Sequence, residues 1–262
     1  MNLLQQFLTN NSCYKAGKYI TPKGVMVHST GVNNPKISRY VPGSSVIGYN
    51  QYGNHWDVSG VGACVHAFIG KVSDGSIATV QTLPWDMRGW HCGDDGNNTH
   101  ISFEICEDDL ANEAYFHKVY KEAVDLTAYL CEMYGLDPLE DGVVICHSEG
   151  HDRGIASMHA DVMHWFPKHA KSMDTFRQDV NKKMRGGVDL TREEVEKICR
   201  ETTVKVLEEL EIARAEQPAS PWAASASVLS RAVAAGISDG SRPRSYTTRE
   251  EVMAMILAAL KG

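Results

Sequence analysis

Five short apolar runs rich in β-branched residues, each bounded by Gly, Pro, Asn or Asp, dominate the first 150 positions. Their length and composition are typical of strands, and their near-continuous apolar character indicates a sheet that is mostly buried. The runs are GVMVHST (24–30), ACVHAFIG (63–70), SIATVQTL (76–83), ISFEIC (101–106) and GVVICH (142–147).

Helical periodicity accompanies these runs. Over 112–134 apolar residues recur at every third or fourth position and the pattern stops at Gly135, which predicts an amphipathic helix. A second helix is expected at about 172–184. Strands interspersed with helices predict an α/β domain over residues 1–185.

The remainder of the chain has a helical pattern only. Arg185-Gly186-Gly187 interrupts the first domain, and a capping-box arrangement of Thr191 and Glu194 predicts the start of a new helix. We expect further helices at 222–235 and 248–260, separated by the turn GISDGSRP. The expected organisation is a domain over 1–185, a helical linker over 186–217 and a small all-helical module over 218–262.

Charge and cysteine usage exclude several classes of protein. The net charge is −7 at pH 7 and no basic cluster occurs, which argues against nucleic-acid binding. The first 18 residues carry no basic side chain before Lys15 and only short apolar runs, so we expect neither a signal peptide nor a membrane anchor. The seven cysteines include no C-x-x-C pair, and we expect most of them to be buried free thiols in a reducing compartment.

Histidine is confined to the first domain, since all 11 histidines lie before residue 170. His28 and His147 each end an apolar strand-like run, and an oxygen-rich stretch that includes Asp161 follows the second. A catalytic zinc commonly takes two imidazoles and a third ligand and leaves one position open to water. From the residues alone, either Asp161 or His159 could be that third ligand.

Several phrases in the right order, GVMVHSTG, GWHCG, ISFEICED, CHSEG and HADVMHWFP, resemble the zinc-dependent N-acetylmuramoyl-L-alanine amidases of type 2, the family shared with peptidoglycan recognition proteins. The resemblance covers about residues 8–180 and is nearest to endolysins of phages and prophages of Gram-positive, clostridial-type hosts. It implies a mixed central sheet flanked by helices, with Zn²⁺ held in a groove along one face.

Carried over by position, the resemblance gives His28, His147 and Asp161 as the zinc ligands. The family usually has Lys two residues before the third ligand, whereas this chain has His159 there. Either His159 takes over the role of polarising the scissile carbonyl and stabilising the oxyanion, which we favour, or it is itself the ligand and Asp161 only supports it.

Glu104 matches the family's acidic residue that faces the activated water, where it would act as general base and then acid. A carboxylate within an apolar strand is costly unless it has such a role. The same strand should direct Ser102 and Cys106 to the face of Glu104. The acidic residues that follow, 107–109, are expected to form a solvated turn.

His66, His91 and Trp90 match positions that line the family's substrate groove. We expect them to bind substrate, with a structural role as the alternative for the two histidines. For Trp90 the alternative is burial, the commoner fate of tryptophan.

The segment SPWAASASVLSRAVAAGISDGSRPRSYTTREEVMAMILAALKG loosely resembles the helical units of S-layer-homology-like modules. The resemblance implies attachment to a secondary wall polymer. Such units usually bury their faces against copies of themselves, so homo-oligomerisation through the C-terminal helices is the alternative.

Together these features predict an enzyme that hydrolyses the amide between N-acetylmuramic acid and L-alanine in bacterial peptidoglycan by zinc-activated water. As an endolysin it would stay in the host cytoplasm until lysis and then act on the cell wall, with no nucleic-acid or membrane partner. Two alternatives remain, a recognition protein that binds peptidoglycan without cutting it and a zinc amidohydrolase acting outside the wall.

Overall fold

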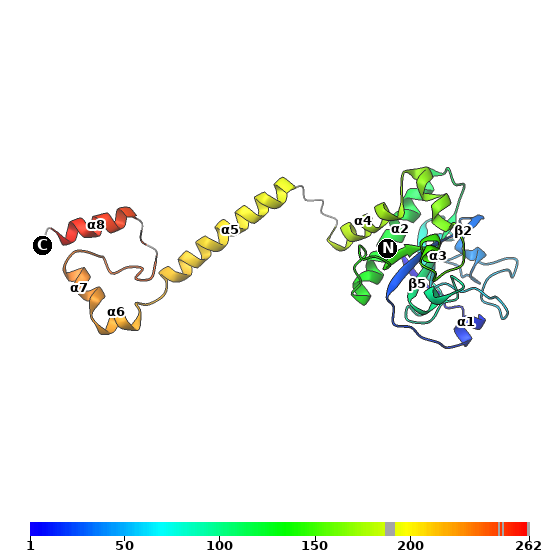
Figure 1. The fold of residues 1–262 in the computed structure, drawn as a ribbon, viewed down its shortest axis with the longest axis horizontal. Coiled ribbons are helices and arrows are strands. Elements are labelled where there is room, and N and C mark those ends of the chain that lie inside the picture. The colour runs from blue at the N-terminus through cyan, green and yellow to red at the C-terminus, as the bar shows by residue number, and fades with distance from the viewer. Residues whose placement is uncertain (187–191, 246, 248, 261–262) are drawn as a thin grey trace. The chain divides into compact units, whose positions relative to one another are not determined.

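The computed structural model describes residues 1–186, 192–245, 247 and 249–260. By its internal contacts the chain divides into two units, residues 1–188 and 189–262 (Figure 1). Thr191, the first residue of the expected capping box with Glu194, lies outside the described residues.

The first unit is built on a six-stranded sheet in the order β1-β4-β3-β5-β2-β6. All neighbouring strands run parallel except β3 and β4, which are antiparallel. The prediction of a mixed central sheet flanked by helices is therefore confirmed. The strands are β1 (Leu3–Gln5), β2 (Gly24–Asn33), β3 (Ala67–Lys71), β4 (Ile77–Gln81), β5 (His100–Glu107) and β6 (Val144–Cys146).

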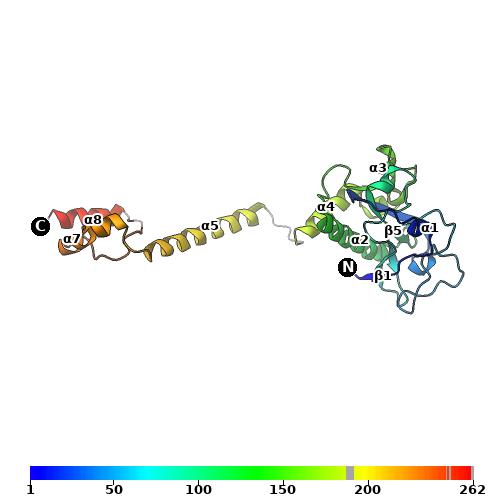
Figure 2. The same cartoon turned by 90° about the horizontal axis from the view of Figure 1, so that it is seen from below.

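Two helices, α2 (Glu113–Tyr134) and α4 (Met173–Met184), lie side by side and cover one face of the sheet (Figures 1 and 2). Strand alternation determines which side chains meet them. In β5, Phe103 and Ile105 point into the core beneath α2, where they pack with Phe116. Both helices were predicted from sequence to within a residue at each end.

The opposite face of the sheet is covered mainly by irregular chain, with α1 (Ser12–Lys15) and the 3-10 turn η1 (Ile37–Arg39). Cys106 packs on this side, as its alternation with Ile105 predicts. His28, Glu104 and Phe68 are register partners across β2, β5 and β3. They therefore form a row on the face that α2 does not cover.

Short turns beyond the ends of the parallel strands complete the first unit. Sequence periodicity missed β1, α1 and these segments because each is too short to show a repeat. The strand expected from residue 63 begins only at Ala67, and Cys64 forms an isolated bridge with Trp90 instead. The turns are η2 (Asp95–Asn98), α3 (His147–Asp152), η3 (Asp161–His164) and η4 (Phe166–His169).

The described part of the second unit consists of α5 (Arg192–Ala215), α6 (Pro221–Ser225), α7 (Val228–Ala234) and α8 (Arg249–Ala259). The single helix expected over 222–235 was wrong. Its interruption falls at Ser227, whose φ of 53° is left-handed and ends the α-helical geometry. Across the described residues, no helix has the length and apolar character needed to cross a membrane.

The cysteines agree with the sequence prediction. All seven are free thiols, and six are buried in the first unit while Cys199 on α5 is exposed. Burial raises the pKa of thiols such as Cys106 and Cys131 well above the ordinary value, so they are poor nucleophiles. These thiols serve the packing rather than the chemistry.

The buried face of α2 yields a stability prediction. Phe116 is fully buried against the sheet, whereas Met133 on the same helix is 45% exposed. Phe116→Ala should lower the free energy of unfolding by about 3–5 kcal/mol because it leaves a cavity in the core. Met133→Ala should change it by less than about 1 kcal/mol. Urea unfolding of the two variants beside the wild type measures both, and equal losses would contradict this packing.

Candidate metal and catalytic site

His28 lies in the middle of β2, where strand alternation determines its direction. Val25 and Val27 enter the core under α2, so Met26 and His28 point to the opposite face. The imidazole is 1% exposed. The sheet thus fixes the direction of this side chain.

His147 follows β6 directly and is the first residue of α3. Because β6 runs parallel to β2 with Cys146 opposite Val27, the next residue along each strand brings His147 beside His28. A capping box in which the Cys146 amide donates to Glu149 holds the start of α3 in place. The His147 ring is almost fully buried.

Asp161 opens η3, the turn that crosses this edge of the sheet. Its φ of 43° lies in the left-handed region, which residues with a Cβ adopt only at a cost. Strained backbone of this kind persists where the surrounding structure holds it, often at functional sites. In this conformation the Asp161 carboxylate faces the two histidines.

Three atoms meet at one point. Asp161 Oδ2 lies 3.1 Å from His28 Nδ1 and 3.0 Å from His147 Nδ1, and the two Nδ1 atoms are 3.2 Å apart. Zinc bonds of about 2.0–2.2 Å in tetrahedral geometry place two ligand atoms roughly 3.3 Å apart. Two imidazoles and a carboxylate at this spacing fit a zinc ion.

The other ring nitrogen of each histidine has a protein partner. His28 Nε2 lies 3.1 Å from His91 Nδ1, and His147 Nε2 lies 3.2 Å from Ser157 Oγ, which donates to the carbonyl oxygen of Cys92. When Nε2 carries the proton and donates it outward, Nδ1 is left as a lone-pair donor. The outer contacts are therefore compatible with the tautomer that a metal requires.

The electrostatics of the cluster favour an ionised Asp161 carboxylate beside a neutral His28 ring. Burial raises the pKa of Asp161, but hydrogen bonds from His147 and His28 outweigh it and hold that pKa well below its usual range. Burial lowers the pKa of His28 despite the nearby Asp161 charge. A neutral imidazole beside an ionised carboxylate is the ligand state that zinc needs.

Glu104 stands next to His28 in register on β5. Its Oε2 is buried, and no group in the described part of the chain hydrogen-bonds to it. Burial, followed by the charges of Asp161 and Glu107, raises the pKa of Glu104 well above its usual value. A carboxyl group in this state accepts and returns a proton near neutral pH more readily than an exposed one.

His159 is exposed at the rim of the cluster. Its ring centroid is 4.7 Å from that of His147, and its Nδ1 lies 3.3 Å from Ser157 Oγ. Among the described residues, the group with metal-ligating spacing consists of His28, His147 and Asp161. The geometry thus groups Asp161 with the two histidines and leaves His159 beside them.

The three residues expected to bind substrate differ in their surroundings. His66 has no exposed surface, and its Nδ1 accepts from the Ser102 amide while Nε2 donates to the Met87 carbonyl, so it is not positioned to contact a substrate. It is a structural residue that connects β5 to the loop before η2. His91 and Trp90 are half-buried, and His91 contacts His28.

Glu107 and Ser157 take part in the site although the sequence did not suggest it. The expectation that residues 107–109 form a solvated turn was wrong for Glu107, which is 4% exposed and accepts hydrogen bonds from Ser29 and Gly31. Its position at the end of an apolar strand was the signal for burial. Ser157 gave no such signal, because its role depends on a loop that returns to His147.

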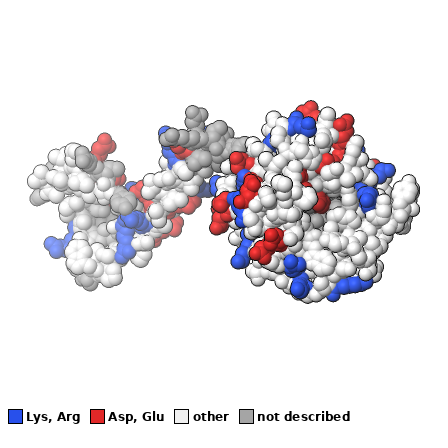
Figure 3. All heavy atoms as spheres, turned by 45° about the vertical axis from the view of Figure 1, so that its right-hand side comes forward, with Lys and Arg blue, Asp and Glu red and all other residues white. Residues whose placement is uncertain are grey.

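Charged side chains are interspersed over the face of the first unit seen in Figure 3, where Lys and Arg form no continuous patch. This distribution agrees with the acidic overall balance of the sequence. Nothing on this face has the extended basic character of a phosphate-binding surface.

The fold and the candidate site can now be compared with known proteins. The family model for N-acetylmuramoyl-L-alanine amidase (Amidase_2) matches residues 18–167, more than half of the chain. The chain belongs to this family, as the sequence motifs predicted, and membership supports peptidoglycan amidase activity. A search of curated proteins finds no match.

Solved structures with the same fold include hydrolase AmiA of Staphylococcus aureus in complex with its ligand, at 24% identity and a TM-score of 0.52 over 70% of this chain and 83% of that one. PlyL aligns at 21% identity and a TM-score of 0.49 over 69% and 97%. The amidase LysC from Clostridium intestinale aligns at 13% identity and a TM-score of 0.43 over 69% and 98%. The likeness to AmiA supports the fold of the first unit.

The buried His66 predicts a pH dependence of stability. Burial lowers its pKa to about 4 from 6.5, so between these values the unfolded chain binds a proton that the folded chain does not. The stabilisation is present above pH 6.5 and is lost as the pH falls toward 4, by roughly 3 kcal/mol. His66→Gln has no imidazole at this position, so its free energy of unfolding should lack this fall. The difference in the free energy of unfolding between wild type and variant should therefore shrink as the pH is lowered from 6.5 to 4.

The exposed His117 provides the control, because its side chain is 56% exposed. His117→Gln should leave the pH dependence of urea unfolding as it is in the wild type. An unchanged slope in His66→Gln would show that the buried ring is not responsible.

Proposed function

We propose that this protein is a zinc-dependent amidase that hydrolyses the bond between N-acetylmuramic acid and the L-alanine of the stem peptide. The observation that carries the proposal is the meeting of His28 Nδ1, His147 Nδ1 and Asp161 Oδ2 within 3.2 Å of one another. Membership of the amidase family supports the choice of substrate.

When bound, Zn²⁺ supplies a Lewis acid that lowers the pKa of water toward about 7 and polarises a carbonyl group. His28, His147 and Asp161 would hold the ion, and the outer partners of the two rings, His91 and Ser157, would keep them oriented. Three protein ligands leave a further coordination position for water or substrate, as hydrolytic zinc requires.

Glu104 is proposed as the general base and then the general acid. Its unpartnered Oε2 and raised pKa suit a carboxylate that takes a proton from water and returns it to the departing amine of L-alanine. His159, exposed beside His147, is proposed to donate to the carbonyl oxygen as negative charge develops there.

The substrate groove is proposed to include His91 and Trp90. Both are only partly buried, and they lie on the chain segment that contacts His28. An indole face is suited to packing against a sugar ring or the stem peptide. His66 takes no part in this proposal because its ring is enclosed.

We further propose that the protein acts as an endolysin of a phage or prophage, made in the host cytoplasm and acting on the wall after lysis. The six buried thiols support synthesis in a reducing compartment, where disulfides do not form. The family supports the wall as its target.

Replacing Glu104 separates metal binding from catalysis. Glu104→Gln should keep zinc at the wild-type level while turnover of purified peptidoglycan falls about 10²- to 10⁴-fold, because a general base is lost without loss of a ligand. Glu132→Gln, an exposed residue of α2, serves as the matched control. The assay counts new N-terminal alanine.

Each contrary result points to a different protein. Wall binding without release of alanine by the wild type would favour a recognition protein. Activity on small acyl amino acids but not on walls would favour a zinc amidohydrolase of another pathway. Full activity in Glu104→Gln would contradict the assigned base.

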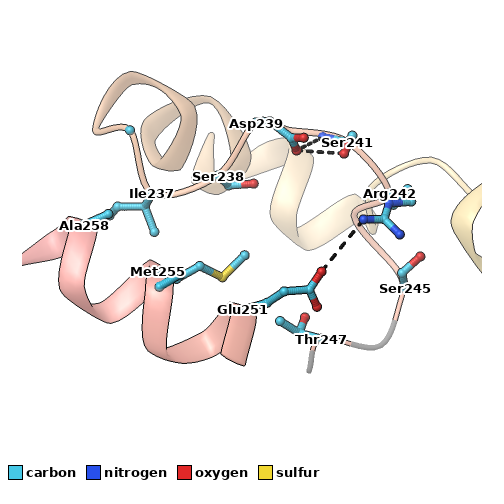
Figure 4. A pocket seen from close by; sticks show the side chains of 12 residues that line it. Ile237, Ser238, Asp239, Ser241, Arg242, Ser245, Thr247, Glu251, Met255 and Ala258 are labelled. Carbon is cyan, nitrogen blue, oxygen red and sulfur yellow. Dashed lines mark hydrogen bonds and ion pairs between the residues drawn. The ribbon is translucent and has the colours of Figure 1, made fainter. Parts of the chain in front are cut away.

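For the C-terminal module we propose attachment to a secondary wall polymer. A pocket of about 480 Å³ lies between the turn after α7 and helix α8 (Figure 4). Ile237 and Met255 contribute apolar surface, while Asp239, Arg242 and Glu251 contribute charge, and Arg242 faces Glu251 at 3.9 Å. Mixed apolar and hydrogen-bonding walls suit a sugar polymer.

Homo-oligomerisation through the C-terminal helices is the second proposal for this module. Helix α5 exposes about half of each of several large apolar side chains in the described structure, an arrangement that association would bury. These side chains are Ile198, Val206, Leu207, Leu210 and Ile212.

Deletion after Gly186 distinguishes the two. If the module anchors the enzyme, wall sedimentation of the shortened protein should fall while its activity on soluble muropeptides stays within about twofold of wild type. If the module dimerises the enzyme, light scattering should show fewer chains per particle after the deletion. The fraction of protein that sediments with cell walls should then stay unchanged. If the shortened protein sediments with walls as the full-length protein does, and the number of chains per particle is also unchanged, both roles would be contradicted.

A further inference from the structure

Glu107 is a buried carboxylate that the proposed chemistry does not use. It ends β5, is 4% exposed, and its Oε1 has three polar partners on two other segments: two hydrogen-bond donors and one histidine nitrogen at ion-pair distance. Burying a carboxylate is costly unless its charge is compensated, so such an arrangement indicates a specific role.

Two of these partners, both hydrogen-bond donors, belong to the chain just after His28. Ser29 Oγ lies 2.7 Å and the Gly31 amide 3.1 Å from Glu107 Oε1, and the Glu107 amide donates to Thr30 Oγ1 at 3.2 Å. The pairing of β2 with β5 loses its regular register between Ser29 and Asn33. The regular backbone pairing of β2 with β5 thus ends at Ser29, one residue beyond His28. From there Glu107 provides hydrogen bonds between the two strands.

The third partner belongs to the segment that carries Asp161 and is an ion-pair contact. His164, the last residue of η3, places Nε2 3.1 Å from the same Glu107 oxygen. Val162, between Asp161 and His164, is fully buried and fixes the turn against β2. One carboxylate oxygen thus joins the strand that carries His28 to the turn that carries Asp161.

We propose that Glu107 is a positioning residue for the metal centre, acting with His164 to hold Asp161 at its distance from His28. The proposal rests on the zinc site of the proposed function. It assigns Glu107 no contact with substrate or with the reacting atoms. Without this connection the strained backbone at Asp161 is free to relax, and the carboxylate moves away from the two imidazoles.

The test compares Glu107→Gln with Asp108→Asn in the full-length protein. Asp108 is the next residue, is also acidic, and pairs with Lys71 at 2.7 Å rather than with either ligand-bearing segment. Gln keeps the size of the side chain and one acceptor oxygen, so folding should survive. The zinc dissociation constant, measured by competition with a chromophoric chelator, should rise about 10- to 100-fold in Glu107→Gln and stay unchanged in Asp108→Asn.

Hydrogen exchange of the metal-free proteins gives a second readout. Peptides covering residues 158–166 should exchange faster in Glu107→Gln than in wild type or Asp108→Asn, and His164→Ala should reproduce the effect. If a Glu107→Gln variant bound zinc as tightly as the wild type, or exchanged these amides no faster, the positioning role would be overturned.

The two hypotheses fail in different ways. A wild type that binds no zinc would remove the proposed metal site, while exchange in the metal-free proteins would still decide whether Glu107 holds η3. Zinc binding by the wild type with no difference between Glu107→Gln and Asp108→Asn would remove only the role of Glu107.

Discussion

The parallel pairing of β5, β2 and β6 is the constraint on which the site depends. Because these strands run in the same direction and in fixed register, Glu104 lies beside His28 and His147 follows directly on the other side. A slip of one residue in β2 would turn His28 into the core under α2. The apolar residues that alternate with these polar ones therefore determine the direction in which the site side chains point.

Contacts around the cluster hold the rings of His28 and His147 and the carboxylate of Asp161 in place. Each imidazole has its far nitrogen engaged, by His91 or Ser157, and the Asp161 backbone is held in a strained conformation. The spacing of the three atoms is that expected of the metal site proposed above.

The sequence was sufficient for the long elements, because strand alternation and helical periodicity have short-range causes, while the candidate site residues came from the family motifs. Alternation along β5 placed Cys106 on the face opposite Phe103 and Ile105, as the structure shows. The sequence could not show that His66 is enclosed, that Glu107 is buried, or that Ser157 contacts His147, since these depend on loops that meet far from each other in sequence. The break at Ser227 depends on a backbone conformation that helix propensity does not encode.

Metal analysis of the purified wild type, Asp161→Ala and His159→Ala tests the central claim most directly. The account predicts stoichiometric zinc in the wild type and in His159→Ala, and its loss from Asp161→Ala. Among the described residues, the group with metal-ligating spacing is His28, His147 and Asp161, and Asp161 Oδ2 lies within 3.1 Å of both histidine Nδ1 atoms. Zinc retained by Asp161→Ala and lost from His159→Ala, or no zinc in the wild type, would contradict it.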